Sequence, residues 1–302
     1  MHGIDYGIVT VYLTAIVLIG LYLQRKASQG IDSYFLGNRN LPWWALASSG
    51  MSSNLDISGT MIIAALIYAL GVKGFYIEIR GGVTLIMAFL MIYMGKWNRR
   101  SGAMTLAEWM ELRFGKGRQG KVARSIAAIA SIVMTIAMVT YFALGGGKFL
   151  DSFLGLQNYF GLPSEFWAAA ILITVAMIYT VASGLYGVVW TDVFQGFLIF
   201  GVIVYMASRA FAITLPEEFA ISMPLFDGGF ERVTTTLKEW TSVIPASKLD
   251  IDAASQYSIY NLFGIAVMFY ILKVVLEGSG GTGNYMLQRY FAAKNDREAG
   301  LL

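Results

Sequence analysis

The stretch Ser48-Ser-Gly-Met-Ser-Ser-Asn-Leu-Asp-Ile-Ser-Gly-Thr60 decides how this chain can fold. Only 3 of its residues are apolar, yet it lies between Trp43 and the apolar run 61–70, where a membrane-spanning helix is expected. Inside a bilayer, backbone leaves helical geometry only where protein or a water-filled cavity satisfies its amide and carbonyl groups. Glycine and serine lower the cost of unwinding. We therefore predict a broken helix that lines a site.

The rest of the chain is strongly apolar. Of its 302 residues, 57% are hydrophobic and 14% are charged, whereas soluble domains have about half and about a quarter respectively. The composition predicts a multi-pass integral protein of the cell membrane, with the lipid bilayer as its surroundings. The net charge of +3 is scattered, and no basic face alternates with aromatic residues, so we expect no nucleic-acid partner.

Seven segments are apolar enough to cross a bilayer, for which a helix needs about 20 residues. They are residues 6–23, 43–70, 75–94, 122–149, 166–182, 188–210 and 257–276. Lys and Arg gather after the first, third and seventh segments, and basic connections favour the cytoplasmic side. This places the amino terminus outside, the carboxyl terminus in the cytoplasm, and residues 211–255 in an extracellular loop. Within that loop, residues 230–240 fit a short surface helix or a plain loop about equally well.

A second interruption ends the seventh segment, where the sequence reads Glu277-Gly-Ser-Gly-Gly-Thr-Gly-Asn284. Two broken helices separated by four plainer ones are typical of inverted-repeat transporters, whose site lies between the breaks. We predict a single all-α transmembrane domain over 1–302. Its parts are an extra amino-terminal helix and cytoplasmic loop (1–41), a first five-helix repeat (42–210), and the first helix of a truncated second repeat (256–302). The repeat argument predicts about four further helices.

Asp56 is the main candidate for binding a cation, because a carboxylate at membrane depth costs about 2.5 to 3.5 kcal/mol unless it is paired or hydrated. Na+ prefers oxygen ligands, and an unwound helix offers carbonyls beside the hydroxyls of Ser52, Ser53 and Ser58. The alternative is close helix packing by small residues, but packing does not require an aspartate. Asp192 is undecided from pattern alone, since an acid in a first helical turn also favours the helix dipole.

Five further polar residues lie near the two breaks and in the third segment, and are candidates for contacting a substrate: Asn54, Glu78, Arg80, Glu277 and Ser279. Glu78 and Arg80 are two residues apart and point to different helical faces, so each needs its own partner. Lys273 and Glu277 are four apart, and a mutually neutralised structural pair is the stronger interpretation for them.

Several kinds of chemistry are excluded. The chain has no cysteine, and its 1 histidine is His2, so disulfides, thiolate or imidazole metal sites and the usual hydrolase base are absent. Residues 278–283 fit a dinucleotide motif and residues 115–121 resemble a phosphate-binding loop, but each lacks the strand, helix or hydroxyl that the motif requires. We predict no organic cofactor and no enzyme.

Ordered motifs along the chain resemble the sodium/solute symporter family, which includes the sodium/glucose, sodium/proline and sodium/sialic acid cotransporters. They are Tyr34-Phe-Leu-Gly-Asn-Arg39, Leu55-Asp-Ile-Ser-Gly59, Thr105-Leu-Ala-Glu-Trp-Met-Glu-Leu-Arg-Phe114, the run 186–195, and Gln288-Arg-Tyr-Phe-Ala-Ala-Lys294. Each motif alone is modest. In order, they cover nearly the whole chain.

This resemblance implies a leucine-transporter-type inverted-repeat bundle that couples the Na+ gradient to symport of a small organic solute by alternating access. It implies that Ser52, Ser53, Asp56 and Ser58 belong to the main sodium site, and that Asp192 lies at an acidic position used for a second sodium or for coupling. In the family, an eighth core helix completes the site. The missing carboxyl-terminal helices would therefore be needed here.

Arg80 lies near a position where sugar-transporting relatives carry an acidic substrate contact, so a cation there favours a carboxylate-bearing substrate. A competing interpretation is a solute-sensing membrane domain of a signalling protein, because relatives of this family occur fused to kinases. The segment following residue 302 in the natural protein would separate the two.

Overall fold

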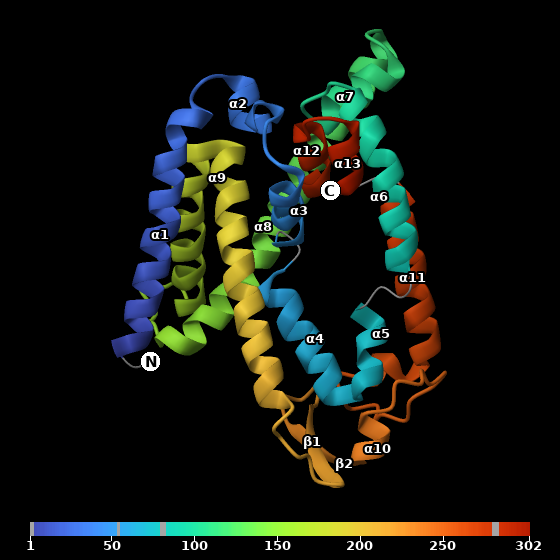
Figure 1. The fold of residues 1–302 in the computed structure, drawn as a ribbon. Helices are drawn as coiled ribbons and strands as arrows, with labels where there is room; N and C mark the ends of the chain where they lie inside the picture. The colour runs from blue at the N-terminus through green and yellow to red at the C-terminus, as the bar shows by residue number, and fades with distance from the viewer. Residues whose placement is uncertain (1–2, 53–54, 79–82, 280–283) are drawn as a thin grey trace. The chain divides into compact units, whose positions relative to one another are not determined.

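A computed structural model describes residues 3–52, 55–78, 83–279 and 284–302 (Figure 1). The chain forms two compact units. The first contains Met1–Ser58, Met91–Gly201 and Thr282–Leu302, and the second contains Gly59–Leu90 and Val202–Gly281. The predicted single domain with its repeat boundaries remains a prediction.

The first unit is built from helices. They are α1 (Gly3–Ala27), α2 (Ile31–Leu36), η1 (Gly37–Arg39), α3 (Trp43–Ser52), the second half of α6 (Val83–Arg100), α7 (Leu106–Phe114), α8 (Arg118–Leu154), most of α9 (Ser164–Ala210), α12 (Asn284–Ala292) and α13 (Asp296–Leu301). Thr105 caps α7 by accepting a hydrogen bond from the Glu108 amide, and Asn295 caps α13 through the Glu298 amide. Such caps satisfy amides that the first helical turn leaves without partners.

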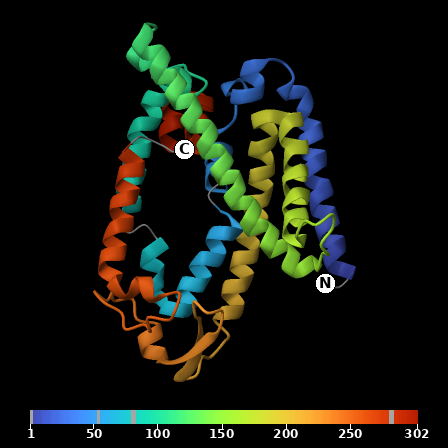
Figure 2. The same ribbon diagram turned by 180° about the vertical axis from the view of Figure 1, so that it is seen from behind.

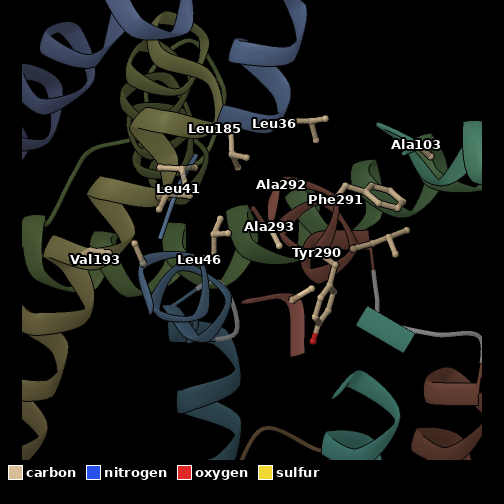
Figure 3. Close-up of a cluster of buried hydrophobic side chains, with 14 residues drawn as sticks. Leu36, Leu41, Leu46, Ala103, Leu185, Val193, Tyr290, Phe291, Ala292 and Ala293 are labelled. Atoms are coloured by element: carbon tan, nitrogen blue, oxygen red, sulfur yellow. The ribbon is translucent and has the colours of Figure 1, made fainter. Parts of the chain in front are cut away.

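The core of the first unit joins sequence-distant segments around α12 (Figure 3). Tyr290 and Phe291 of α12 are 2% and 1% exposed and pack with Leu36, Leu46 and other buried apolar residues. Burial raises the pKa of Tyr290 to about 12, because the ionised phenol is poorly solvated there. The short apolar face of α12 therefore anchors the end of the chain in the core.

Two features of α6 hold α12 in place. Gly95 faces the Tyr290 ring so closely that an added Cβ would lie 2.5 Å from Cε1 of the ring. Arg99 donates hydrogen bonds to the carbonyls of Ala293 and Lys294, the second at 3.1 Å. These carbonyls follow the end of α12, so a cation there also suits the helix dipole.

Helix α9 consists of two rods joined by a sharp bend, and α1 lies beside them in both views (Figures 1 and 2). Gly184 forms the bend with φ 53° and ψ −149°. A Cβ there would lie 2.5 Å from the Tyr34 carbonyl oxygen. Glycine is required at this position both by its conformation and by the close approach of Tyr34.

The second unit contains α4 (Ile57–Leu70) beyond its first two residues, η2 (Val72–Gly74), α5 (Phe75–Glu78), η3 (Ser258–Leu262) and α11 (Phe263–Ser279). It also contains β1 (Glu218–Pro224), β2 (Phe230–Thr236) and α10 (Leu237–Trp240). The strands form an antiparallel hairpin in which Ile221 pairs with Val233. The Trp240 indole donates to the Tyr68 carbonyl at 3.2 Å, which ties the hairpin segment to α4.

The hairpin corrects two expectations. Residues 230–236 form a strand, so neither a surface helix nor a plain loop describes the start of the segment 230–240, and only Leu237–Trp240 is helical. Valine and threonines along β2 favour an extended backbone. The chain is mostly helical, at 73%, and the hairpin is the departure from the predicted all-α class within the described residues.

Fewer membrane spans are established than the seven predicted. Over the described ranges, α1, α8 and α9 are long and apolar enough to cross a membrane, and α3 with α4 makes a fourth if the pair is counted as one span. Helix α9 alone includes two of the predicted segments, because its 47 residues continue through the bend at Gly184. The count of seven remains a prediction.

Replacing the bend glycine should destabilise the protein. Gly184→Ala places a side chain in backbone geometry that costs about 1 to 3 kcal/mol and against the Tyr34 carbonyl, so we expect a lower thermal midpoint, measured by tryptophan fluorescence in detergent. Gly201→Ala is the matched control, since nothing lies within 4 Å of its added Cβ. Equal midpoints for the two variants would contradict this account of the bend.

Candidate functional site

The predicted interruption of the polar helix is confirmed. Helix α3 ends at Ser52, Leu55 and Asp56 lie outside any helix, and α4 begins at Ile57. Ser53 and Asn54 lie outside the described residues. The backbone therefore leaves helical geometry beside Asp56, the residue on which the sequence argument depended.

Asp192 is the acid around which described polar groups converge. Its side chain is 15% exposed and lies on the second rod of α9. The Ser49 hydroxyl donates to Asp192 Oδ2 at 2.5 Å, and the Ser52 hydroxyl donates to the Asp192 backbone carbonyl at 3.0 Å. Both serines lie on α3, so the end of the broken helix is fastened to α9 through this residue.

Arg289 provides the opposite charge from α12. Its side chain is 4% exposed, and Nη2 lies 3.5 Å from Asp192 Oδ2. Its Nε and Nη2 donate to the Ser49 hydroxyl oxygen at 3.1 and 2.9 Å. Ser49 therefore accepts from the cation and donates to the anion, so it relays between the two charges.

The electrostatics of this cluster are those of a buried, hydrogen-bonded ion pair. Removing water from two charges is expensive, and their attraction offsets that cost only when further hydrogen bonds satisfy the remaining donors and acceptors. Ser49 supplies such bonds on both sides. The Ser49 hydrogen bond and the Arg289 guanidinium, 3.5 Å from Oδ2, therefore oppose the cost of burying the Asp192 carboxylate.

Close packing between α3 and α9 depends on a small residue. A Cβ added to Gly196 would lie 3.0 Å from the Ser52 hydroxyl oxygen. The rings of Trp44 on α3 and Trp190 on α9 also meet edge to face, with centroids 5.7 Å apart. The small residues of α3 thus do pack helices, as the alternative interpretation held, while their hydroxyls bind Asp192.

Ser58 presents a second oxygen of interest. Its hydroxyl is buried and, within the part of the chain that the structure describes, has no hydrogen-bond partner. It faces Gly145 of α8, where a Cβ would lie only 1.7 Å from that oxygen. An unsatisfied buried hydroxyl costs about 1 to 3 kcal/mol, and it is the kind of oxygen that Na+ accepts as a ligand. Ser58 therefore offers one oxygen of a kind that fits a sodium ion.

The structure describes the other predicted site residues only in part. Asp56 is half-buried. Ser53, Asn54 and Arg80 lie outside the described residues. Glu78 is the last residue of α5, and Glu277 and Ser279 lie near the end of α11, where the structure describes the backbone. No group of three or more acidic or histidine side chains able to hold a metal occurs among the described residues.

Sequence reasoning missed Ser49 and Arg289. Ser49 lies in the quoted polar stretch, but its hydroxyl was not distinguished from its neighbours. Arg289 was counted as a basic residue of a cytoplasmic connection, whereas the structure buries it. The sequence does contain a signal that Arg289 is buried, namely its apolar neighbours. Leu287, Tyr290 and Phe291 indicate a helix face that packs into a core.

The model of the Sodium:solute symporter family matches residues 34–299. A sodium/glucose cotransporter of Vibrio parahaemolyticus is 28% identical to 99% of this chain, which spans 51% of that relative. Human sodium/glucose cotransporter 4 is 29% identical over 67% of this chain and 28% of its own length. These relatives are cotransporters rather than enzymes.

A solved structure shares the fold. A Na+-coupled sialic acid symporter in a substrate-bound, outward-open state aligns with a TM-score of 0.65 and 19% identity, covering 99% of this chain and 55% of that protein. At this identity the likeness concerns the fold alone. The chain spans about half the length of the Vibrio relative and of this structure.

Breaking the buried pair should be costly. Arg289→Met leaves the Asp192 carboxylate buried without its cation, and we expect a loss of about 3 to 5 kcal/mol in the free energy of unfolding. Unfolding in mixed detergent micelles, followed by tryptophan fluorescence, measures it. The double variant Asp192→Asn/Arg289→Met should lose less than the sum of its single variants, because the uncompensated charge is removed.

Arg100→Met is the matched control for this prediction. Arg100 pairs with Asp296 at 2.6 Å, but the two side chains are 55% and 42% exposed. An exposed pair contributes about 0 to 1 kcal/mol. If Arg289→Met lowers the free energy of unfolding no more than Arg100→Met does, burial does not make the Asp192–Arg289 pair more important for stability than an exposed pair.

Proposed function

Because this chain belongs to the sodium:solute symporter family, we propose that it works in the sodium-coupled symport of a small organic solute by alternating access. The observation that carries this proposal is the buried acid Asp192, held with a cation against the end of an interrupted helix. The named relatives support it, since they are sodium/glucose cotransporters. The proposal includes a multi-pass protein with its amino terminus outside and its carboxyl terminus in the cytoplasm.

The oxygen atoms for a sodium ion come, in this proposal, from two places in the first unit. Ser52 ends α3, Asp56 lies in the break and Ser58 lies in the first turn of α4. Ser53, which is outside the described residues, is proposed as a further sodium ligand. Asp192 offers a second position. When bound, Na+ supplies a positive charge that these oxygens stabilise. Further helices, beyond those of this chain, complete the sodium site in the proposal.

In this proposal, a cation that binds at Asp192 competes with the contacts that Arg289 and Ser49 make there. The Arg289 guanidinium and an incoming cation share one acceptor, Asp192 Oδ2. Occupancy by a second cation would weaken the hold of Asp192 on Arg289, and Arg289 belongs to α12, whose apolar face fills the core. In this way, the charge state at Asp192 acts on the packing of α12. The cost of moving a buried charge makes the two arrangements discrete.

The class of solute is proposed from the candidate contact residues. Glu277, Ser279, Asn54, Glu78 and Arg80 remain candidate substrate contacts, and an arginine among them favours a carboxylate-bearing solute because its planar fork matches a carboxylate. The sialic acid symporter and the glucose cotransporters show that relatives of this fold act on small organic solutes.

Sodium-driven uptake tests the function. The full-length natural protein is reconstituted in proteoliposomes and tested with a panel of sugars and carboxylate-bearing solutes. Uptake of at least one of these solutes should rise under an inward Na+ gradient. Asp192→Asn should lower the apparent Na+ affinity by about tenfold or more, since each 1.4 kcal/mol of lost interaction is a factor of ten. Asp227→Asn, in an exposed turn, is the control. Uptake that is indifferent to the Na+ gradient for every solute would contradict symport.

Residues 1–302 alone give a second test. If further helices complete the sodium site, this chain reconstituted by itself should show no uptake driven by a Na+ gradient. Robust sodium-driven uptake by residues 1–302 would show that the chain supplies every ligand the site needs.

A further inference from the structure

A glycine-rich turn joins α7 to α8 and displays three cations. The turn begins at Gly115, whose φ is 82°, and folds so tightly that a Cβ on Gly120 would lie 1.5 Å from the Gly115 carbonyl oxygen. Lys116, Arg118 and Lys121 are exposed around it. The turn fixes its backbone by close packing, so the three cations are displayed at one end of α8.

These three cations form no ion pair with the acidic side chains of the described residues. The nearby acid Glu111 pairs with Arg124 at 2.6 Å, which holds α7 against α8. The three positive charges lie within residues 116–121 and repel one another, and an anionic ligand would relieve that repulsion.

An apolar groove begins directly beside the cations. A hollow of about 490 Å³ is lined by Lys116, Arg118 and Lys121 together with Val122, Ser125, Ile126 and Ile129. Val122, Ile126 and Ile129 are 51%, 63% and 63% exposed. Steps of three and four residues place these side chains on the same helix face as Arg118. One face of α8 is therefore cationic at its start and apolar beyond.

The apolar face continues along α8, which the other described helices of this chain cover only slightly. Val133 and Ile136 extend the stripe and are 61% and 62% exposed. In α8, only 6% of the most apolar 18-residue window is buried within the chain, against 17% in α1 and 28% in α9. A helix of 37 residues is about 55 Å long, well beyond the ~30 Å of hydrocarbon in a bilayer. A helix of this length that crosses a bilayer extends past the hydrocarbon, so the cations at its start can lie in the headgroup layer.

We propose that this corner binds an anionic phospholipid. The phosphodiester lies among Lys116, Arg118 and Lys121, the Ser125 hydroxyl is available to a phosphate or glycerol oxygen, and an acyl chain follows Val122, Ile126 and Ile129. A free phosphate or nucleotide would leave the apolar floor exposed to water. An acidic peptide would pair with the cations but would leave the apolar stripe beyond them without a partner. A lipid satisfies both halves of the surface.

Native mass spectrometry of the intact chain in detergent tests the site. Phosphatidylglycerol is titrated against phosphatidylcholine with the same acyl chains, and against inorganic phosphate. Phosphatidylglycerol should bind more tightly than phosphatidylcholine, and Lys116→Gln/Arg118→Gln/Lys121→Gln should lose about tenfold or more of that affinity. Ile126→Ser/Ile129→Ser should also weaken phosphatidylglycerol while leaving the cations in place.

Arg232→Gln/Lys238→Gln/Lys248→Gln is the matched control, because it removes the same charge from exposed residues elsewhere in the chain. Retention of helicity by circular dichroism shows that each variant is folded. Equal loss of phosphatidylglycerol binding in the two triple variants would overturn the proposal, since it would reflect net charge. Displacement of phosphatidylglycerol by millimolar inorganic phosphate would overturn it in favour of a simple anion site.

Discussion

A carboxylate inside an apolar helical bundle must be neutralised where it stands, and the first unit is arranged around that requirement. Asp192 is neutralised by Arg289, with Ser49 between them. Arg289 reaches it because α12 is anchored by its aromatic residues, and those residues fit because Gly95 leaves space for the Tyr290 ring. Removing water from the pair makes the geometry strict, since buried charges tolerate little misplacement.

Some of this could be predicted from the sequence because local chemistry is enough. A run of serine, glycine and aspartate at membrane depth cannot form an ordinary lipid-facing helix, and the structure interrupts the helix beside Asp56. The family followed from short ordered motifs. The partner of Asp192 could not be predicted this way, because 97 residues separate it from Arg289 and no local pattern reports which distant cation a buried acid receives.

Basic residues illustrate the limit most clearly. Counting Lys and Arg by connection treats Arg289 and Lys116 alike, and the structure gives them opposite environments: one is 4% exposed against an acid, the other is exposed on a turn. The difference arises from neighbours, since Arg289 lies on a short helix with a buried apolar face and Lys116 lies between glycines. The hairpin 218–236 was not predicted, for a related reason. Its strand pairing depends on a partner segment rather than on its own composition.

The separation between Asp192 and Arg289 also has a consequence for biosynthesis. A ribosome adds about 5 to 20 residues per second, so the acid emerges about 5 to 20 seconds before the arginine that neutralises it. During that interval α3 and α9 exist without α12, and Asp192 has only serine hydroxyls and water to solvate it. Release of these helices into lipid before α12 is made would leave the Asp192 carboxyl without its cation, which costs free energy whether the group stays charged or takes up a proton.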